Sequence, residues 1–174
     1  MNRLPNFMLP EKVFIMIEER IQRGATIIEL GSGDGTKKLA ENYDITSIEH
    51  DENWASILEN THIYAPIVKN EISSSLGEEG WYDIVETDER IPNEIDLLLI
   101  DGPPGWIGRS GILNQAWLIH RSKEILIDDT DRSAESKLAN SILEITNGSI
   151  EEFCADELNG RGEPRRFSWI KQGE

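Results

Sequence analysis

A glycine-rich turn, ELGSGDGT at residues 29–36, is the first candidate for chemistry in this sequence. We expect a buried strand before it and a helix after it, which would place bare backbone N–H groups at the positive end of a helix. The spacing Gly31-x-Gly33-x-Gly35 puts Thr36 where a dinucleotide-binding turn has its third glycine, and it lacks the lysine of a P-loop. The pattern therefore predicts a nucleotide-binding turn that favours neither NAD nor ATP, or a turn with a structural role alone.

An acid follows this turn at an interval that suits recognition of a ribose. The next expected strand ends at Glu49, eighteen residues after Gly31. An acid that accepts hydrogen bonds from ribose hydroxyls is expected ~20 residues on. His50 and Asp51 extend the same edge, and His50 is a candidate to flank an adenine. The alternatives are a solvent-facing strand end for Glu49 and an exposed loop histidine for His50.

A second group of carboxylates follows two later strands. Asp101 begins the turn DGPPG, which its prolines and glycines make rigid, and Asp128 and Asp129 follow the next strand. Neighbouring parallel strands should bring these acids to one edge of the sheet, where open α/β sheets bind ligands. Three oxygen donors of this kind suit Mg²⁺ or Mn²⁺. The alternative is that the acids cap backbone N–H groups, with Asp129 or Asp131 at the start of the following helix.

Alternating strands and helices must position these residues. Apolar runs predict strands at 25–30, 45–49, 62–68, 95–100 and 124–127. Helical spacing predicts helices at 7–21, 36–43, 52–60, 112–120 and 134–145. Alternating segments at 149–155 and 166–171 predict an antiparallel pair at the end. We therefore expect one α/β domain over residues 1–174: a doubly wound, Rossmann-like seven-stranded sheet, mostly parallel, with a C-terminal antiparallel hairpin, in a three-layer αβα sandwich.

These motifs resemble a known enzyme family. Residues 26–36, followed by Ile48-Glu49-His50-Asp51, are similar to the first two motifs of class I S-adenosylmethionine-dependent methyltransferases. The resemblance implies that the acid and glycines of the turn hold the methionine portion of the cofactor, and that Glu49 binds its ribose. The candidate cofactor-binding residues are Glu29, Gly31, Ser32, Gly33, Gly35, Glu49, His50 and Asp101.

Resemblance to two narrower groups bears on the acceptor. In catechol-type O-methyltransferases, carboxylates at the ends of these same two strands bind a divalent metal. The matching positions are Asp101, Asp128 and Asp129, although that group usually carries Asp-Asn where this chain has Asp-Asp. The resemblance implies Mg²⁺ or Mn²⁺ polarising an acceptor hydroxyl, with Asp101 and Asp128 as catalytic residues. Residues 65–67, Trp81-Tyr82-Asp83, DGPPG and Gly108-Arg109 carry a looser similarity to polysaccharide-modifying O-methyltransferases, including the glucuronoxylan type. This similarity implies a sugar-like hydroxyl as the acceptor.

The amino-acid composition excludes some classes of binding partner. Seventeen basic against thirty-three acidic residues give a net charge of −16, which repels phosphate backbones and anionic membrane surfaces. No apolar run approaches the ~20 residues of a membrane span, and no signal peptide is expected. With a single cysteine, Cys154, the sequence allows neither an internal disulfide nor a cysteine metal cluster. We therefore expect a cytoplasmic protein that acts on a small-molecule or sugar acceptor, without nucleic acid or membrane partners. The oligomeric state stays open.

Several arginines and tryptophans could have either a functional or a structural role. Arg109 could receive a substrate carboxylate or pair with a surface acid. The arginines at 161–166 could attract an anion or balance nearby carboxylates. Trp106 and Trp117 could form walls of an acceptor pocket. The helical spacing of Trp117 favours a place in the core, whereas Trp106, on the loop after the rigid turn, is less easily explained by packing.

Methyl transfer to a hydroxyl is the preferred function, and two rivals stay open. Gly33-Asp34-Gly35 and the acidic edge at Glu49 also resemble polyamine synthases, which transfer an aminopropyl group from decarboxylated S-adenosylmethionine. The DGPPG turn is not what that family places after its central strand. The second rival is a catalytically silent nucleotide-binding or scaffold domain, because the short chain leaves little room for a lid over an acceptor.

Overall fold

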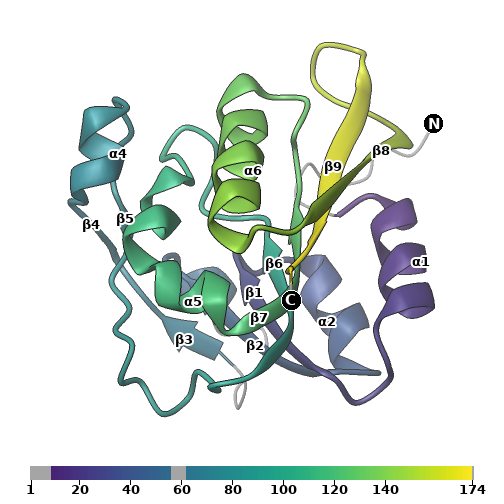
Figure 1. Ribbon diagram of the computed structural model, residues 1–174, viewed down its shortest axis with the longest axis horizontal. Coiled ribbons are helices and arrows are strands. Elements are labelled where there is room, and N and C mark those ends of the chain that lie inside the picture. The colour runs from purple at the N-terminus through teal and green to yellow at the C-terminus, as the bar shows by residue number, and fades with distance from the viewer. Residues whose placement is uncertain (1–8, 56–61, 174) are drawn as a thin grey trace.

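The protein is seen here as a computed structural model that describes residues 9–55 and 62–173. Within that part of the chain, the main sheet contains β1 (Thr26–Leu30), β2 (Asp44–Glu49), β3 (His62–Tyr64), β6 (Ile95–Ile100), β7 (Ser122–Ile127), β8 (Ser149–Leu158) and β9 (Pro164–Lys171). Its order is β3-β2-β1-β6-β7-β9-β8 (Figure 1). Strands β3, β2, β1, β6 and β7 are parallel to one another, and β9 is antiparallel to both β7 and β8. The predicted seven-stranded sheet with a C-terminal antiparallel hairpin is confirmed.

Helices cover both faces of this sheet. On one face lie α1 (Glu11–Arg20) and α2 (Asp34–Ala40), and on the other lie α5 (Ala116–His120) and α6 (Ser133–Thr146) (Figure 1). The central strand β6 serves both layers, because Leu97 and Leu99 pack toward α1 while Leu98 and Ile100 pack toward α6. All four are fully buried, as expected of a parallel strand covered on both faces. None of the helices described is long and apolar enough to cross a membrane.

The chain between β2 and β6 differs from the prediction of one strand over residues 62–68. Strand β3 ends at Tyr64, and β4 (Ile67–Val68) instead pairs with β5 (Trp81–Tyr82) in a separate two-stranded sheet. Pro66 explains the break, because proline has no N–H to donate to a sheet ladder and restricts the residue before it. A short helix, α4 (Glu71–Ser75), connects β4 to β5.

The boundaries of several helices also differ from the predicted ones. The helix predicted at 36–43 begins at Asp34, directly after the glycines. The one predicted at 112–120 is a 3₁₀ helix, η1 (Ser110–Gln115), continued by α5. The first helix begins after Pro10, and α3 is described over Glu52–Ala55. The predicted helical residues 7–8 and 56–60 lie outside the described residues.

Two glycine turns meet where β1 and β6 end. A Cβ atom on Gly31 (φ +93°) would lie 2.9 Å from the Cα of Gly102, and a Cβ on Gly102 would lie 2.7 Å from the Cα of Gly31. Side chains at these positions would force the two strand ends apart. Gly35 is also confined, because a Cβ there would lie 3.0 Å from the ring of Phe14 in α1. Packing alone therefore requires glycine at Gly31 and at Gly102 in DGPPG, whereas a side chain at position 35 would press on the ring of Phe14.

A buried carboxylate ties the first glycine turn to the sheet. Oε2 of Glu29, in β1, accepts hydrogen bonds from Thr36 Oγ1 (2.7 Å) and from Ser47 Oγ. Thr36 Oγ1 in turn accepts the backbone N–H of Gly33 at 3.0 Å. Burial raises the pKa of Glu29 to about 7; the two hydroxyls oppose the rise, and the charge of Glu49 adds to it. One carboxyl group thus joins β1, β2 and the first turn of α2.

This carboxyl predicts a pH-dependent stability. The folded state holds a proton on Glu29 that the unfolded chain releases near pH 4.5. The resulting stabilisation is complete below pH 4.5 and is lost as the pH rises to about 7. The loss should amount to roughly 3 kcal/mol of unfolding free energy, from ~1.4 kcal/mol per pKa unit.

Urea denaturation between pH 4.5 and 8 measures the effect. Glu29→Gln keeps acceptors for both hydroxyls but cannot titrate, so its unfolding free energy should lack this decline with pH. The exposed Glu41→Gln serves as the control and should keep the wild-type slope. A wild-type slope in Glu29→Gln would contradict the assignment.

Candidate functional site

The predicted site residues gather at one edge of the main sheet. The strand order reverses between β1 and β6, and ligands bind α/β sheets at the carboxyl ends of the strands at such a point. Gly31 follows β1, Glu49 ends β2, Asp101 follows β6, and Asp128 follows β7. Because these strands are parallel neighbours, the fold brings all four residues to the same edge.

Glu49 lies beneath the glycine turn. Its side chain is buried, so the alternative of a solvent-facing strand end is wrong. Oε2 accepts the N–H of Ser32 at 2.8 Å, and Oε1 accepts those of His50 (2.7 Å) and Asp51 (2.9 Å). The ring of His50 lies against the same carboxylate, with Nδ1 2.6 Å from Oε1. Glu49 therefore fixes the glycine turn, and Oε2 keeps a second lone pair for another donor.

Some buried polar atoms at this edge have no hydrogen-bond partner in the part of the chain that the structure describes. They are Ser32 Oγ and Tyr82 Oη, together with Asp128 Oδ1 in the acidic cluster described below. Tyr82 is 1% exposed, and its hydroxyl lies 2.6 Å from where a Cβ on Gly102 would be. Burial, with the charge of Glu49 adding to it, raises the pKa of Tyr82 well above its usual value, so the group stays a proton donor. A buried donor of this kind costs about 1–3 kcal/mol unless something pairs with it.

Tyr82 is a candidate site residue that sequence reasoning missed. It stands in a two-residue strand, and a pair of residues carries no periodic signal. It reaches the glycine turns only because the chain folds back between β4 and β5. The apolar pair Trp81-Tyr82 in a polar stretch was the one local sign of a buried segment.

The three predicted metal ligands come together as an acidic cluster of Asp101, Asp128 and Asp129. Each offers an oxygen, and these oxygens all lie within 4.8 Å of one another. Asp128 is fully buried and Asp129 is 8% exposed, whereas Asp101 is partly exposed. Shielding by the surrounding protein, together with the charge of Asp128, raises the pKa of Asp101 well above its usual range. Burial and the charge of Asp129 also raise the pKa of Asp128, against the opposing effect of Arg165.

The alternative that Asp129 or Asp131 caps the following helix is wrong. The N-cap position of α6 is Arg132, and no side chain makes a cap hydrogen bond there. Asp131 instead accepts hydrogen bonds from Asn159 and Arg161, near the turn between β8 and β9. Asp129 adopts a left-handed backbone conformation (φ +60°) and directs its carboxylate to arginines.

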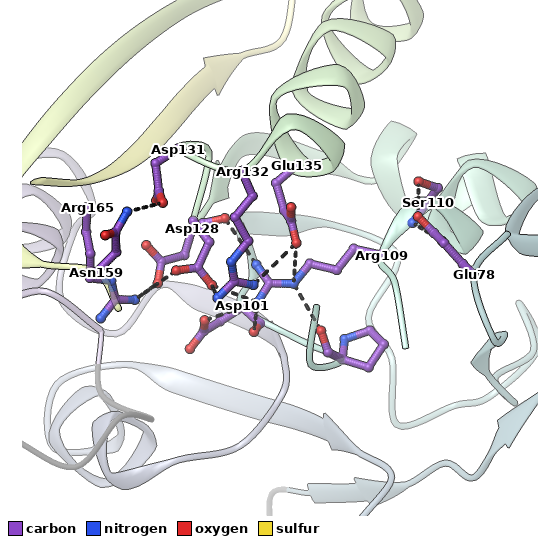
Figure 2. A network of polar contacts seen from close by, with 12 residues as sticks. Glu78, Asp101, Arg109, Ser110, Asp128, Asp131, Arg132, Glu135, Asn159 and Arg165 are labelled. Atoms are coloured by element: carbon purple, nitrogen blue, oxygen red, sulfur yellow. Dashed lines mark hydrogen bonds and ion pairs between the residues drawn. The ribbon is translucent and has the colours of Figure 1, made fainter. Parts of the chain in front are cut away.

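Arg109 matches neither of its two predicted interpretations. It is 4% exposed, and all three of its side-chain nitrogens donate to the protein (Figure 2). Nε donates to the carbonyl of Pro103 (3.1 Å), Nη1 to that of Asp128 (3.1 Å), and Nη2 to that of Asp101 (2.5 Å). Nη2 also lies 3.2 Å from Oδ2 of Asp129. Arg109 is therefore a buried link between the ends of β6 and β7.

Two of the three C-terminal arginines balance carboxylates, as one of their two interpretations proposed. Arg165, in β9, pairs with Asp128 and Asp129, and Arg161 pairs with Asp131 and Glu163. The two tryptophans lie in different surroundings, and the pocket-wall interpretation of each stays a prediction. Trp117 packs against the core under α5, whereas Trp106 is 70% exposed on the loop that follows DGPPG.

The fold of this chain is similar to those of solved protein structures, although no protein-family model and no curated protein matches its sequence. An O-methyltransferase from Bacillus cereus in complex with SAH is 15% identical, with a TM-score of 0.61 over 97% of this chain and 84% of that one.

Two further structures share the arrangement. The O-methyltransferase TomG from Streptomyces achromogenes, involved in tomaymycin synthesis and solved with SAM, is 14% identical, with a TM-score of 0.58 over 98% of this chain and 84% of that one. The N-methyltransferase NodS from Bradyrhizobium japonicum is 11% identical, with a TM-score of 0.55 over 94% of each chain. The chain therefore has the Rossmann-like fold of the S-adenosylmethionine-dependent methyltransferases.

Proposed function

We propose that the protein is a single-domain class I methyltransferase that transfers a methyl group from S-adenosylmethionine to a hydroxyl of a small molecule or sugar. The observation that carries the proposal is a set of buried polar groups without a partner among the described residues. They lie at the sheet edge where the strand order reverses, and the most important of them is the hydroxyl of Tyr82. A protein that needed this edge only for packing would gain stability by replacing them with apolar groups. A polar ligand bound over the glycine turn would pair with these polar groups and so explains why the protein keeps them.

The residues at this edge have distinct roles in the proposal. Glu49 accepts hydrogen bonds from the ribose through the spare lone pair of Oε2, and His50 flanks the adenine. Glu29 acts from beneath, by holding Thr36 and through it the N–H of Gly33. Tyr82 donates from beside Gly31 and Gly102 to the methionine portion.

Asp101 is the proposed base. It follows β6 beside Gly31 and is partly exposed, so an acceptor can reach it. Its raised pKa makes the ionised carboxylate a stronger base than that of an ordinary aspartate. The bound cofactor supplies an electrophilic methyl group, and Asp101 orients the acceptor hydroxyl and receives its proton. Asp128 is buried and bonded to Arg165. Its role is therefore to hold the guanidinium charge of Arg165 near Asp101.

The two rivals differ from this proposal in measurable ways. A scaffold domain would bind SAH but transfer no labelled methyl group to any member of a broad panel of hydroxyl acceptors. An aminopropyl transferase would prefer decarboxylated S-adenosylmethionine. Methyl transfer is favoured because the structures with this fold named above are methyltransferases, two of them solved with SAH or SAM.

Ribose recognition by Glu49 is tested by isothermal titration calorimetry with SAH. Glu49→Gln leaves one oxygen in place of two, so we expect binding about 10- to 100-fold weaker than in the wild type, the range for hydrogen bonds to charged groups. The matched control is Asp51→Asn, whose side chain accepts from Asn53 in the next helix. It should bind SAH as the wild type does. Equal affinity in Glu49→Gln would remove Glu49 from the site.

Tyr82→Phe separates a ligand-binding role from a packing role. Removing the unpartnered hydroxyl should leave the melting temperature of the free protein unchanged or higher, because a buried donor without a partner is destabilising. Binding of SAH should weaken by about 3- to 10-fold, as expected for the loss of one neutral hydrogen bond. A variant with lower stability and unchanged SAH affinity would show that the hydroxyl serves the fold alone.

A further inference from the structure

Arginine side chains surround the acidic cluster (Figure 2). Among the described residues, Arg165 reaches it from β9, Arg109 from the loop before η1, and Arg132 from the residue before α6. Nη2 of Arg165 bonds Oδ2 of Asp128 and lies 3.4 Å from Oδ1 of Asp129. These contacts involve the same carboxylates that a metal ion would need.

The cluster is a poor fit to a divalent metal despite its suitable donor atoms. Both oxygens of Asp129 are already engaged: Oδ1 by Arg165, and Oδ2 by Arg109 (3.2 Å) and Arg132 (3.0 Å). Oδ2 of Asp128 is held by Arg165. In the described residues, Oδ1 of Asp128 has no partner, and Oδ1 of Asp101 lies 3.7 Å from Nη2 of Arg109. A Mg²⁺ or Mn²⁺ ion that bound these oxygens at ~2.1 Å would stand beside the fixed guanidinium groups and would be repelled by them.

We propose that the guanidinium of Arg165 takes the place of a divalent cation between Asp128 and Asp129, so that the acidic cluster works without a resident metal ion. Arg165 is suited to this position because a planar guanidinium bridges two carboxylates and keeps its charge when partly buried. Its side chain is 17% exposed, against 0% for Asp128. The strand β9, which pairs directly with β7, carries it to the cluster.

The charge balance supports the same conclusion, and this step rests on the proposed function. Within the described residues, the cluster and the adjoining Glu135 supply four carboxylates against the three guanidinium groups of Arg109, Arg132 and Arg165. The set keeps a formal charge of −1, and its member Asp101 follows β6 beside Gly31, where the sulfonium of the proposed cofactor would add a single positive charge. A divalent ion would instead make the set positive and repel the sulfonium.

Binding of Mn²⁺ to the cofactor-free protein tests the proposal without measuring activity. The free Mn²⁺ signal in electron paramagnetic resonance is followed in EDTA-treated wild type, Arg165→Met and Arg166→Met. Met keeps the length and apolar stem of the side chain but removes the charge. Arg166, the exposed neighbour of Arg165, provides a matched loss of charge outside the cluster.

The expected results differ sharply among the three proteins. Wild type and Arg166→Met should leave the Mn²⁺ signal unchanged up to about 1 mM, the weak end of protein affinities for such ions. Arg165→Met should bind one Mn²⁺ at least about tenfold more tightly, a change of the size seen when groups around a metal site are altered. The affinity of the wild type for SAH should be the same with EDTA and with Mn²⁺.

Two results would overturn the proposal. One is stoichiometric Mn²⁺ binding by the wild type, a measurement that stands even if Arg165→Met fails to fold. The other is a folded Arg165→Met that binds Mn²⁺ no better than the wild type. If SAH does not bind at all, the proposed function fails, but the Mn²⁺ measurements still decide the role of Arg165.

Discussion

The buried guanidinium of Arg109 is the interaction on which the candidate site depends. Its nitrogens bond the carbonyl groups of Pro103, Asp101 and Asp128, so one side chain holds the turn after β6 against the end of β7. A buried cation is stable only when such acceptors surround it, and the nearby carboxylates of Asp129 and Glu135 complete the set. This arrangement helps to hold Asp101 in place beside the contact of Gly102 with Gly31.

Much of the fold could be predicted because its signals are local. The run IDLLLI is apolar on both faces and became the central strand β6, and the alternating C-terminal segments became the hairpin β8–β9. The interval from Gly31 to Glu49 placed an acid under the turn, because a strand, a short helix and a second strand have limited lengths. Glycine spacing did not reveal that Gly31 is also required for packing against Gly102.

The parts that could not be predicted depend on contacts between distant segments. Arginine is usually exposed, so its type and position favoured a surface or substrate-facing role for Arg109, and only the folded chain brings its acceptors together. The pattern Asp128-Asp129 indicated metal ligands, whereas Asp129 contacts arginines from three separate elements. A protein with a net charge of −16 thus concentrates positive charge where its acids are most buried.

A crystal structure of the protein grown with SAH and MnCl₂, with anomalous data collected at the manganese edge, would test both the cofactor site and the role of the arginines. We expect SAH over the glycine turn, its ribose hydroxyls on Glu49, and no anomalous peak among Asp101, Asp128 and Asp129, with Arg165 still bonded to Asp128. SAH bound away from Glu49 would contradict the proposed site. A manganese peak coordinated by the three aspartates, with Arg165 displaced, would contradict the role given to the arginines.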